Sequence, residues 1–190
     1  MKANIGKRIL VVGDSNAGKS TLAARLAADL DLPFVEIDAL FWLPNWQTRS
    51  GDEFQRLLSE NLPTDGSWSA AGNYFKEQVP WLRADTIVWL DYPLRVTLPR
   101  LVKRTWRRWR REEVLWGTNQ ERITNQLMVW DPSRSLINWT IRNHRRRIRT
   151  YEAAMRGPLF GQARWFRLGS PAETAAWFEG VSEAVARISL

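Results

Sequence analysis

The chain contains 190 residues, carries a formal net charge of +8 and has no cysteine. This length fits one domain with its own hydrophobic core. The lack of cysteine excludes a disulfide framework, a thiolate zinc site and cysteine catalysis. The charge is uneven, because the segment from Arg95 to Arg149 holds 15 Lys or Arg and only 4 acids. Such a basic block favours an anionic partner, either the phosphates of small molecules or a nucleic acid backbone.

The sequence contains neither a membrane-span pattern nor a secretory-leader pattern. No apolar run approaches the roughly 20 residues that cross a bilayer. No apolar segment precedes the first predicted strand, which begins at residue 8. We therefore expect a soluble, cytoplasmic protein without a membrane partner.

The first predicted element is a strand over Arg8–Val12, whose apolar and β-branched run is typical of a strand buried on both faces. The residues that follow fit the phosphate-binding pattern G-x-x-x-x-G-K-[ST] at every fixed position. They are Gly13, Asp14, Ser15, Asn16, Ala17, Gly18, Lys19, Ser20 and Thr21. Apolar residues then recur at helical spacing as far as Leu30, so a helix begins within the motif. Strand, loop and helix occur in the order that a nucleotide site requires; the alternative is a glycine turn without nucleotide.

The motif predicts how ATP and Mg²⁺ would be bound. Gly13 and Gly18 allow backbone angles that turn successive N–H groups toward phosphate oxygens. The start of the helix adds unpaired N–H groups and its positive dipole end. Lys19 would reach the β- and γ-phosphates, and Ser20 would ligate magnesium. The predicted cofactors are therefore ATP and Mg²⁺.

Asp38 follows a second predicted strand, Phe34–Ile37. Ligands of open α/β sheets bind at the carboxyl ends of the strands, so Asp38 is a candidate to orient a hydroxyl group or a metal-bound water. Capping of the following turn or helix is an equally weighted alternative. The aromatic segment 40–46 is predicted to form a wall over a pocket or a packed loop.

The next predicted elements lead to a second candidate acid. A capping box, Ser50–Glu53, begins a helix. A weak third strand, Trp68–Ala71, precedes the turn at 72–74, and a clear fourth strand, Thr86–Leu90, ends on Asp91. An apolar strand followed by aspartate is typical of a magnesium-linked Walker B carboxylate, so Asp91 is a candidate metal ligand.

The basic block is predicted to be helical at about 98–109, 120–130 and 133–155. Its only histidine, His144, has no second histidine or cysteine nearby to complete a zinc site, and we interpret it as structural or surface.

A fifth strand at Ala163–Leu168 and a helix capped by Ser170 end the chain. Five strands alternating with helices predict a three-layer α/β fold with a mainly parallel five-stranded sheet. The arginine-rich insert, about 95–155, would cover the carboxyl edge of that sheet.

Several of these stretches together resemble the adenylate-kinase-like P-loop proteins known as DNA topology modulation proteins. The resemblance rests on segments 13–21 and 84–91, on Asp38-Ala39-Leu40-Phe41-Trp42 with Pro44 and Trp46, and on Gly72-Asn73-Tyr74. It covers nearly the whole chain. It implies a P-loop NTPase fold of the nucleoside-monophosphate-kinase type, with one domain over 1–190 and an arginine-bearing lid.

The resemblance also implies roles for individual residues. Lys19 and Ser20 would handle phosphate and magnesium, while Asp38 and the turn at Gly72-Asn73 would face the acceptor. The turn at 169–171 would lie near the adenine. The arginines implied near the lid, which we predict to be catalytic, are Arg104, Arg107 and Arg108.

The chain departs from related kinases just before the glycine of the third-strand turn. Those kinases often carry an acid there, whereas this chain has Ala71. If that acid organises magnesium-bound water, its task would pass to Asp91 or Asp38, or catalysis would be weaker.

Three functions are consistent with these features. The leading hypothesis is a small-molecule kinase that transfers the γ-phosphoryl group of ATP to a nucleotide or a small hydroxylated acceptor. Asp38 would suit a hydroxyl compound and the arginines a nucleotide phosphate, so the sequence leaves the acceptor open, as it does the oligomeric state. The alternatives are a nucleotide-responsive protein that binds nucleic acid nonspecifically through Arg95–Arg149 with little catalysis, or a P-loop nucleotide hydrolase.

Overall fold

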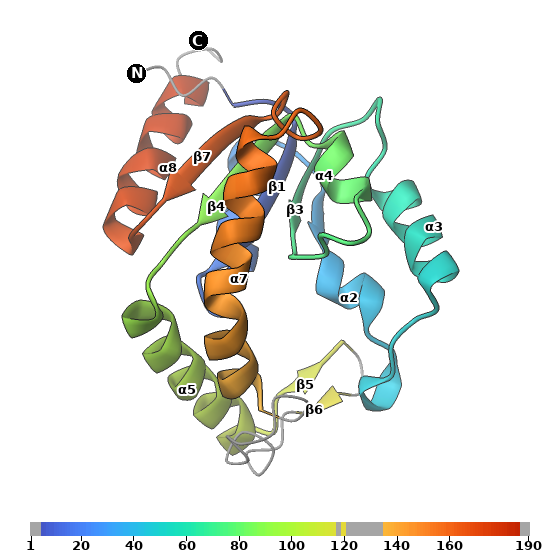
Figure 1. Ribbon diagram of the computed structural model, residues 1–190, viewed down its shortest axis with the longest axis vertical. Helices are drawn as coiled ribbons and strands as arrows, with labels where there is room; N and C mark the ends of the chain where they lie inside the picture. Colours follow the sequence, from blue (N-terminus) through green and yellow to red (C-terminus); the bar gives the residue numbers. More distant parts are fainter. Residues whose placement is uncertain (1–4, 117–118, 121–134, 187–190) are drawn as a thin grey trace.

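The computed structural model describes residues 5–116, 119–120 and 135–186. Its centre is a five-stranded sheet in the order β2-β3-β1-β4-β7, in which all neighbouring strands are parallel (Figure 1). The strands are β1 Arg8–Gly13, β2 Phe34–Glu36, β3 Trp68–Ala71, β4 Thr86–Leu90 and β7 Arg164–Leu168. The loop after β1 therefore leaves the sheet at the middle of its carboxyl edge. This arrangement confirms the predicted parallel sheet.

Helices pack on both faces of the sheet, and others lie beyond its carboxyl edge (Figure 1). They are α1 Lys19–Asp29, α2 Ile37–Phe41, α3 Gly51–Asn61, α4 Val79–Arg83, α5 Leu94–Arg110, α7 Leu136–Arg156 and α8 Pro171–Ala186, with a short 3-10 helix, η1, at Pro44–Trp46. A two-stranded antiparallel ribbon joins β5 Val114–Leu115 to β6 Asn119–Gln120. No helix within the described ranges is long and apolar enough to cross a membrane.

Alternate residues of β1 enter two separate cores, because successive side chains of a strand point to opposite faces. Leu10 and Val12 belong to the core formed with α3, α4 and α7, whereas Ile9 and Val11 belong to the core formed with α1 and α8. These two cores separate the three layers of the fold. The three-layer prediction is therefore confirmed.

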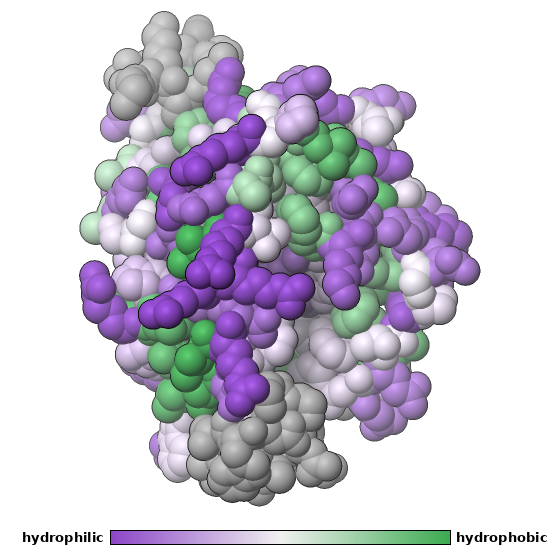
Figure 2. Space-filling view, viewed as in Figure 1, coloured by the Kyte–Doolittle hydropathy of each residue, from purple (hydrophilic) through white to green (hydrophobic). Residues whose placement is uncertain are grey.

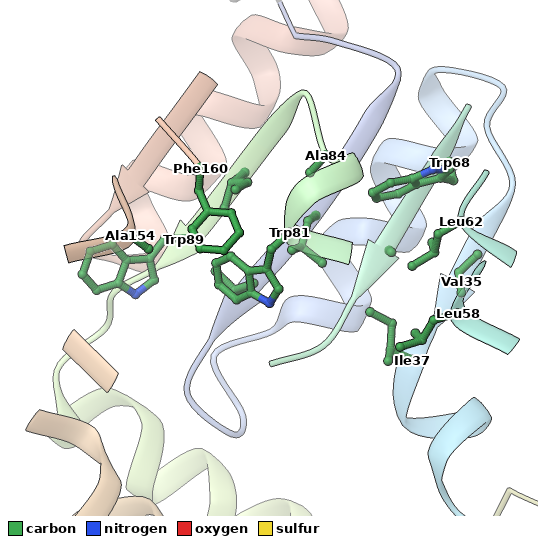
Figure 3. Close-up of a cluster of buried hydrophobic side chains, with 14 of the residues drawn as sticks. Val35, Ile37, Leu58, Leu62, Trp68, Trp81, Ala84, Trp89, Ala154 and Phe160 are labelled. Atoms are coloured by element: carbon green, nitrogen blue, oxygen red, sulfur yellow. The ribbon is translucent and has the colours of Figure 1, made fainter. Parts of the chain in front are cut away.

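Aromatic packing fixes α7 on one face of the sheet. Trp81 of α4 lies 5.0 Å, ring centre to ring centre, from Tyr151 of α7, which in turn lies 5.5 Å from Trp89 of β4. All three side chains are at most 2% exposed. Figure 3 shows Trp81 and Trp89 beside Phe160 and Ala154 in this core. Because large aromatic groups contribute most of the apolar area here, the second half of α7 is part of the core rather than a detached lid.

Two predictions about secondary structure need correction, and a third is confirmed. The second strand ends at Glu36, so Asp38 lies in the first turn of α2 instead of directly after a strand. Gln120 is paired with Val114 in the ribbon and does not begin a helix; the rest of the helix predicted at 120–130 lies outside the described residues. The third helix of the basic block is confirmed as α7, whose N-cap is the hydroxyl of Ser135.

Candidate phosphate and acceptor site

The loop between β1 and α1 has the backbone geometry of a phosphate cradle. Gly13 has a φ of 146° and Gly18 a φ of 99°, and Asn16 between them also has a positive φ of 64°. A Cβ atom on Gly13 would lie 2.5 Å from the carbonyl oxygen of Leu90, so only glycine fits there. Gly18 is the N-cap of α1, whose first N–H groups have no partner within the helix. The cradle therefore fits an anion.

Lys19 is the charged group around which the site is built. Its Nζ donates a hydrogen bond to the carbonyl oxygen of Asp14, 3.0 Å away, so the side chain lies back over the loop. Burial lowers the pKa of the Lys19 ammonium, and Arg104 lowers it further, while Asp38 and Glu36 raise it. Charged residues from β2, α2 and α5 therefore lie near enough to Lys19 to affect the pKa of its ammonium.

Glu36 is a candidate site residue that sequence reasoning missed. Its carboxylate accepts a hydrogen bond from the hydroxyl of Ser20, the predicted magnesium ligand. Burial raises the pKa of the Glu36 carboxyl group and Asp38 raises it further, while the bond from Ser20 and the charges of Lys19 and Arg104 lower it. The sequence feature that could have identified Glu36 is its position at the carboxyl end of a strand, two residues before Asp38.

Asp38 lies beside an aromatic cluster. Its Oδ1 accepts a hydrogen bond from the hydroxyl of Tyr74 at 2.7 Å. Burial and the neighbouring Asp38 raise the pKa of Tyr74, so the phenol stays protonated and remains a donor. Phe41 lies 5.0 Å from the Tyr74 ring and 5.1 Å from that of Phe54, so the start of the aromatic segment packs against α3 and the turn after β3. Asp38 does not cap α2, whose N-cap is Glu36, although a negative charge in the first turn is favourable.

Asn73 fastens the phosphate loop to the turn after β3. Its Oδ1 accepts from the N–H of Gly13 at 3.1 Å, and its Nδ2 donates to the carbonyl oxygen of Gly13 at 2.7 Å. The hydroxyl of Tyr151 donates to the same Oδ1 at 3.1 Å. One side chain thus connects the loop, the sheet edge and α7.

The comparisons with known proteins agree with this architecture. The chain matches the solved structure of a gluconokinase from Sinorhizobium meliloti 1021 with a TM-score of 0.50 and 16% identity, over 96% of this chain and 93% of that one. It matches a shikimate kinase from Bacteroides thetaiotaomicron with a TM-score of 0.51 and 16% identity, over 97% and 99%. The chain has a P-loop kinase-like fold. No protein-family model and no curated protein sequence matches it, so the resemblance to the topology modulation family stays a prediction.

Within this P-loop kinase-like fold, the three predicted lid arginines lie in different surroundings. Arg104 is close enough to Lys19 to lower its pKa. Arg108 pairs with Glu113, with 3.3 Å between Nε and Oε1, at the end of α5. Arg107 is exposed on the same helix. Of the three, Arg104 is the one whose charge acts on Lys19 of the phosphate loop.

Asp91 follows β4 as predicted, but its carboxylate already has a cationic partner. Arg167 of β7 donates from Nη2 and Nε to Asp91 Oδ2, at 2.7 and 2.8 Å. Arg167 also pairs with Glu152 of α7 at 2.9 Å. These contacts explain the position of Asp91 as part of an ion-pair network between β4, β7 and α7.

The described part of the chain holds no group of three or more His, Asp or Glu residues that could bind a metal ion by themselves. Mg²⁺ in phosphoryl-transfer sites needs fewer protein ligands, since nucleotide phosphates and waters supply the rest. The hydroxyl of Ser20 with the adjacent carboxylate of Glu36 fits that kind of site. Both groups lie beside the lysine that would contact the same phosphates.

Proposed function

We propose that this protein is an ATP-dependent kinase that phosphorylates a small hydroxylated acceptor. The observation that carries the proposal is the glycine cradle with Lys19 at its end, where Asp38, Glu36 and Arg104 all lie near enough to affect the pKa of the Lys19 ammonium. A carboxylate for the acceptor proton, a carboxylate for magnesium and two cations for phosphate are the parts that phosphoryl transfer uses. The likeness to a gluconokinase and a shikimate kinase supports the fold on which this proposal rests.

Each residue would have a separate task in this reaction. The loop N–H groups and Lys19 would hold the β- and γ-phosphates, and Ser20 and Glu36 would hold Mg²⁺, which when bound neutralises phosphate charge. Asp38, oriented by the bond from Tyr74, would accept the proton of the acceptor hydroxyl as its oxygen bonds to the γ-phosphorus. Arg104 would neutralise charge on the transferring group while ADP leaves. We assign the metal to Glu36 rather than Asp91 because Arg167 already binds the Asp91 carboxylate.

The test is ADP formation from Mg-ATP by the purified protein, measured with and without candidate acceptors. The panel should contain neutral polyols, sugar acids, hydroxylated cyclic acids and nucleoside monophosphates. Stimulation by a hydroxylated compound, with one phosphate transferred per ADP formed, is the expected result. Turnover without any acceptor would instead indicate a nucleotide hydrolase, and absence of nucleotide binding would contradict the proposal.

A second candidate function, binding of nucleic acid, is favoured by the exposed face of α5. Trp106 and Trp109 are 52% and 43% exposed, and their rings lie 5.1 Å apart. Figure 2 shows a hydrophobic patch where α5 lies, bordered by hydrophilic residues. The exposed cations of α5 and its end are Arg95, Arg100, Lys103, Arg107, Arg110 and Arg111. Aromatic rings beside cations suit single-stranded nucleic acid, whose bases stack while its phosphates pair.

This second candidate predicts steep salt dependence. If about six to ten phosphates are contacted, affinity for single-stranded DNA should fall by about 10³ to 10⁵ between 50 and 200 mM salt. Replacing Trp106 by alanine should weaken binding further at fixed salt, whereas Trp42→Ala, on the acceptor side, serves as a matched control. Fluorescence anisotropy of a labelled oligonucleotide measures both effects. Affinity that is independent of salt would exclude this function.

A further inference from the structure

The second residue of the phosphate loop is a buried acid. Asp14 is 4% exposed, and it lies directly after Gly13, at the start of the cradle. A loop that binds phosphates collects negative charge, and a carboxylate buried within it would repel that charge in a medium of low dielectric constant. Nucleotide binding therefore requires that the charge of Asp14 be balanced locally.

Helix α7 supplies that balance with two side chains. His144 Nδ1 lies 2.5 Å from Asp14 Oδ2, and the guanidinium of Arg147 pairs with Asp14 Oδ1. An ionised carboxylate can only accept, so Nδ1 is the nitrogen that carries the hydrogen in this bond. The side chains of Arg147 and His144 are only 9% and 15% exposed, so solvent does little to screen these contacts.

The arginine is also held from its other side. The guanidinium of Arg147 lies 5.2 Å from the ring centre of Trp139, one of the aromatic side chains of the same helix. One turn further on, Tyr151 anchors α7 in the core and bonds to Asn73, which itself holds Gly13. Helix α7 thus reaches the phosphate loop at two consecutive residues, by an ion pair at Asp14 and through Asn73 at Gly13.

Besides Lys19, whose Nζ donates to the carbonyl oxygen of Asp14, a second acid, Asp91, lies beside this cluster. A small hollow lies between α7 and the end of β4, and its walls include Asp14, His144, Arg147 and Asp91. Asp91 is paired with Arg167. Asp14 and Asp91, the two acids at the hollow, are each paired with an arginine. Without Arg147, Asp14 would keep His144 as its partner within the described part of the wall.

We propose that Arg147 and His144 are positioning residues, in which Arg147 neutralises Asp14 and His144 donates a hydrogen bond to it, and that together they hold its carboxylate against α7 so that the loop can accept a polyanion. This inference rests on the proposed nucleotide binding. It assigns α7 a task in ATP affinity that does not require either residue to contact the nucleotide. The competing possibility is that Arg147 binds phosphate directly. The two roles predict opposite results when Arg147→Met is combined with Asp14→Asn.

The experiment measures the dissociation constant of Mg-ADP by calorimetry for the wild type, Arg147→Met, Asp14→Asn and the double variant. Arg147→Met should raise the dissociation constant about tenfold or more, because it leaves a buried carboxylate near the phosphates. Asp14→Asn keeps the backbone N–H of the loop and should bind at least as tightly as the wild type. The double variant should return to within about twofold of wild type, since neither charge is then left alone.

Two further variants keep the proposal testable. Arg145→Met removes an exposed arginine of the same helix and should leave the dissociation constant unchanged. If Arg147→Met does not fold, as judged by thermal unfolding, the same comparison is made with His144→Leu, alone and combined with Asp14→Asn. This pair tests the contact of His144 with Oδ2 of Asp14. In that pair, Asp14→Asn should again restore the affinity lost on replacing the histidine.

Failure of this inference differs from failure of the proposed function. If the wild type binds Mg-ADP but Asp14→Asn does not restore binding to Arg147→Met, then Arg147 contacts phosphate and the positioning role is wrong. Equal affinity in the wild type and Arg147→Met would also overturn it. If the wild type binds no nucleotide, the proposed function itself fails.

Discussion

Replacing Lys19 by alanine should abolish acceptor-stimulated ADP formation, lowering kcat/KM by on the order of 10³ or more. The reason is that Lys19 is the cation at which the other charged groups of the site meet. Alanine cannot replace a charge on the transferring phosphoryl group, and such charges stabilise the transition state more than the ground state. The fold should persist, because the lysine is a partly desolvated cation rather than an apolar core residue.

The matched control for this variant is Lys76→Ala, which removes an exposed lysine from the turn after β3. It should retain wild-type activity. Circular dichroism and thermal unfolding should show that both variants are folded. A folded Lys19→Ala protein with unchanged turnover would contradict the assignment of the nucleotide site.

Replacing Glu36 by glutamine should raise the Mg²⁺ concentration needed for half-maximal activity about 10- to 100-fold. Glutamine keeps the size of the side chain and can still bond to Ser20, but it loses the negative charge next to the predicted metal ligand. The measurement is ADP formation across a Mg²⁺ titration at fixed ATP. Asp91→Asn is the comparison, and it should shift the titration little because Arg167 binds that carboxylate. If Asp91→Asn shifts the titration and Glu36→Gln does not, the metal ligand is Asp91 rather than Glu36.

The pH profile offers a second readout of Glu36. Burial raises the pKa of its carboxyl group, and only the ionised form carries the charge that would hold magnesium. At Mg²⁺ concentrations below saturation, activity should therefore fall as the pH drops through this raised pKa, whereas saturating Mg²⁺, which would bind only the ionised form, should move the acid limb to lower pH. Glu36→Gln should lose that limb. An acid limb that is unchanged in the variant would show that another group titrates there.

The arrangement of α7 suggests why the phosphate loop is held so firmly in this chain. Gly13 is bonded at both its N–H and its carbonyl group to Asn73, and Asp14 is paired with α7. A loop that is already in its binding conformation loses less entropy when the ligand arrives. Helix α7 of the basic insert thus contacts both Asn73 and Asp14.

The sequence by itself determined the elements whose signals are local. The phosphate loop could be predicted because its glycine spacing, its lysine and the flanking strand and helix all lie in one continuous stretch of the sequence. Four further strands and the N-caps at Ser50 and Ser170 were likewise predicted from short patterns, since capping bonds join residues three positions apart. The parallel sheet followed from the alternation of strands with helices. The short α2 was missed because five residues give too little periodicity to distinguish from a strand end.

Only the tertiary structure decided which side chains complete the site. Asp14 meets His144 across 130 residues, Asn73 meets Gly13 across 60, and Tyr151 meets Asn73 across 78. No pattern within a segment encodes such contacts, because they depend on which strand lies beside β1 and on how α7 crosses the sheet. The same packing gave Asp91 an arginine partner and brought Glu36 to Ser20. Local chemistry thus fixed the phosphate loop, while the packing of distant elements fixed the charges around it.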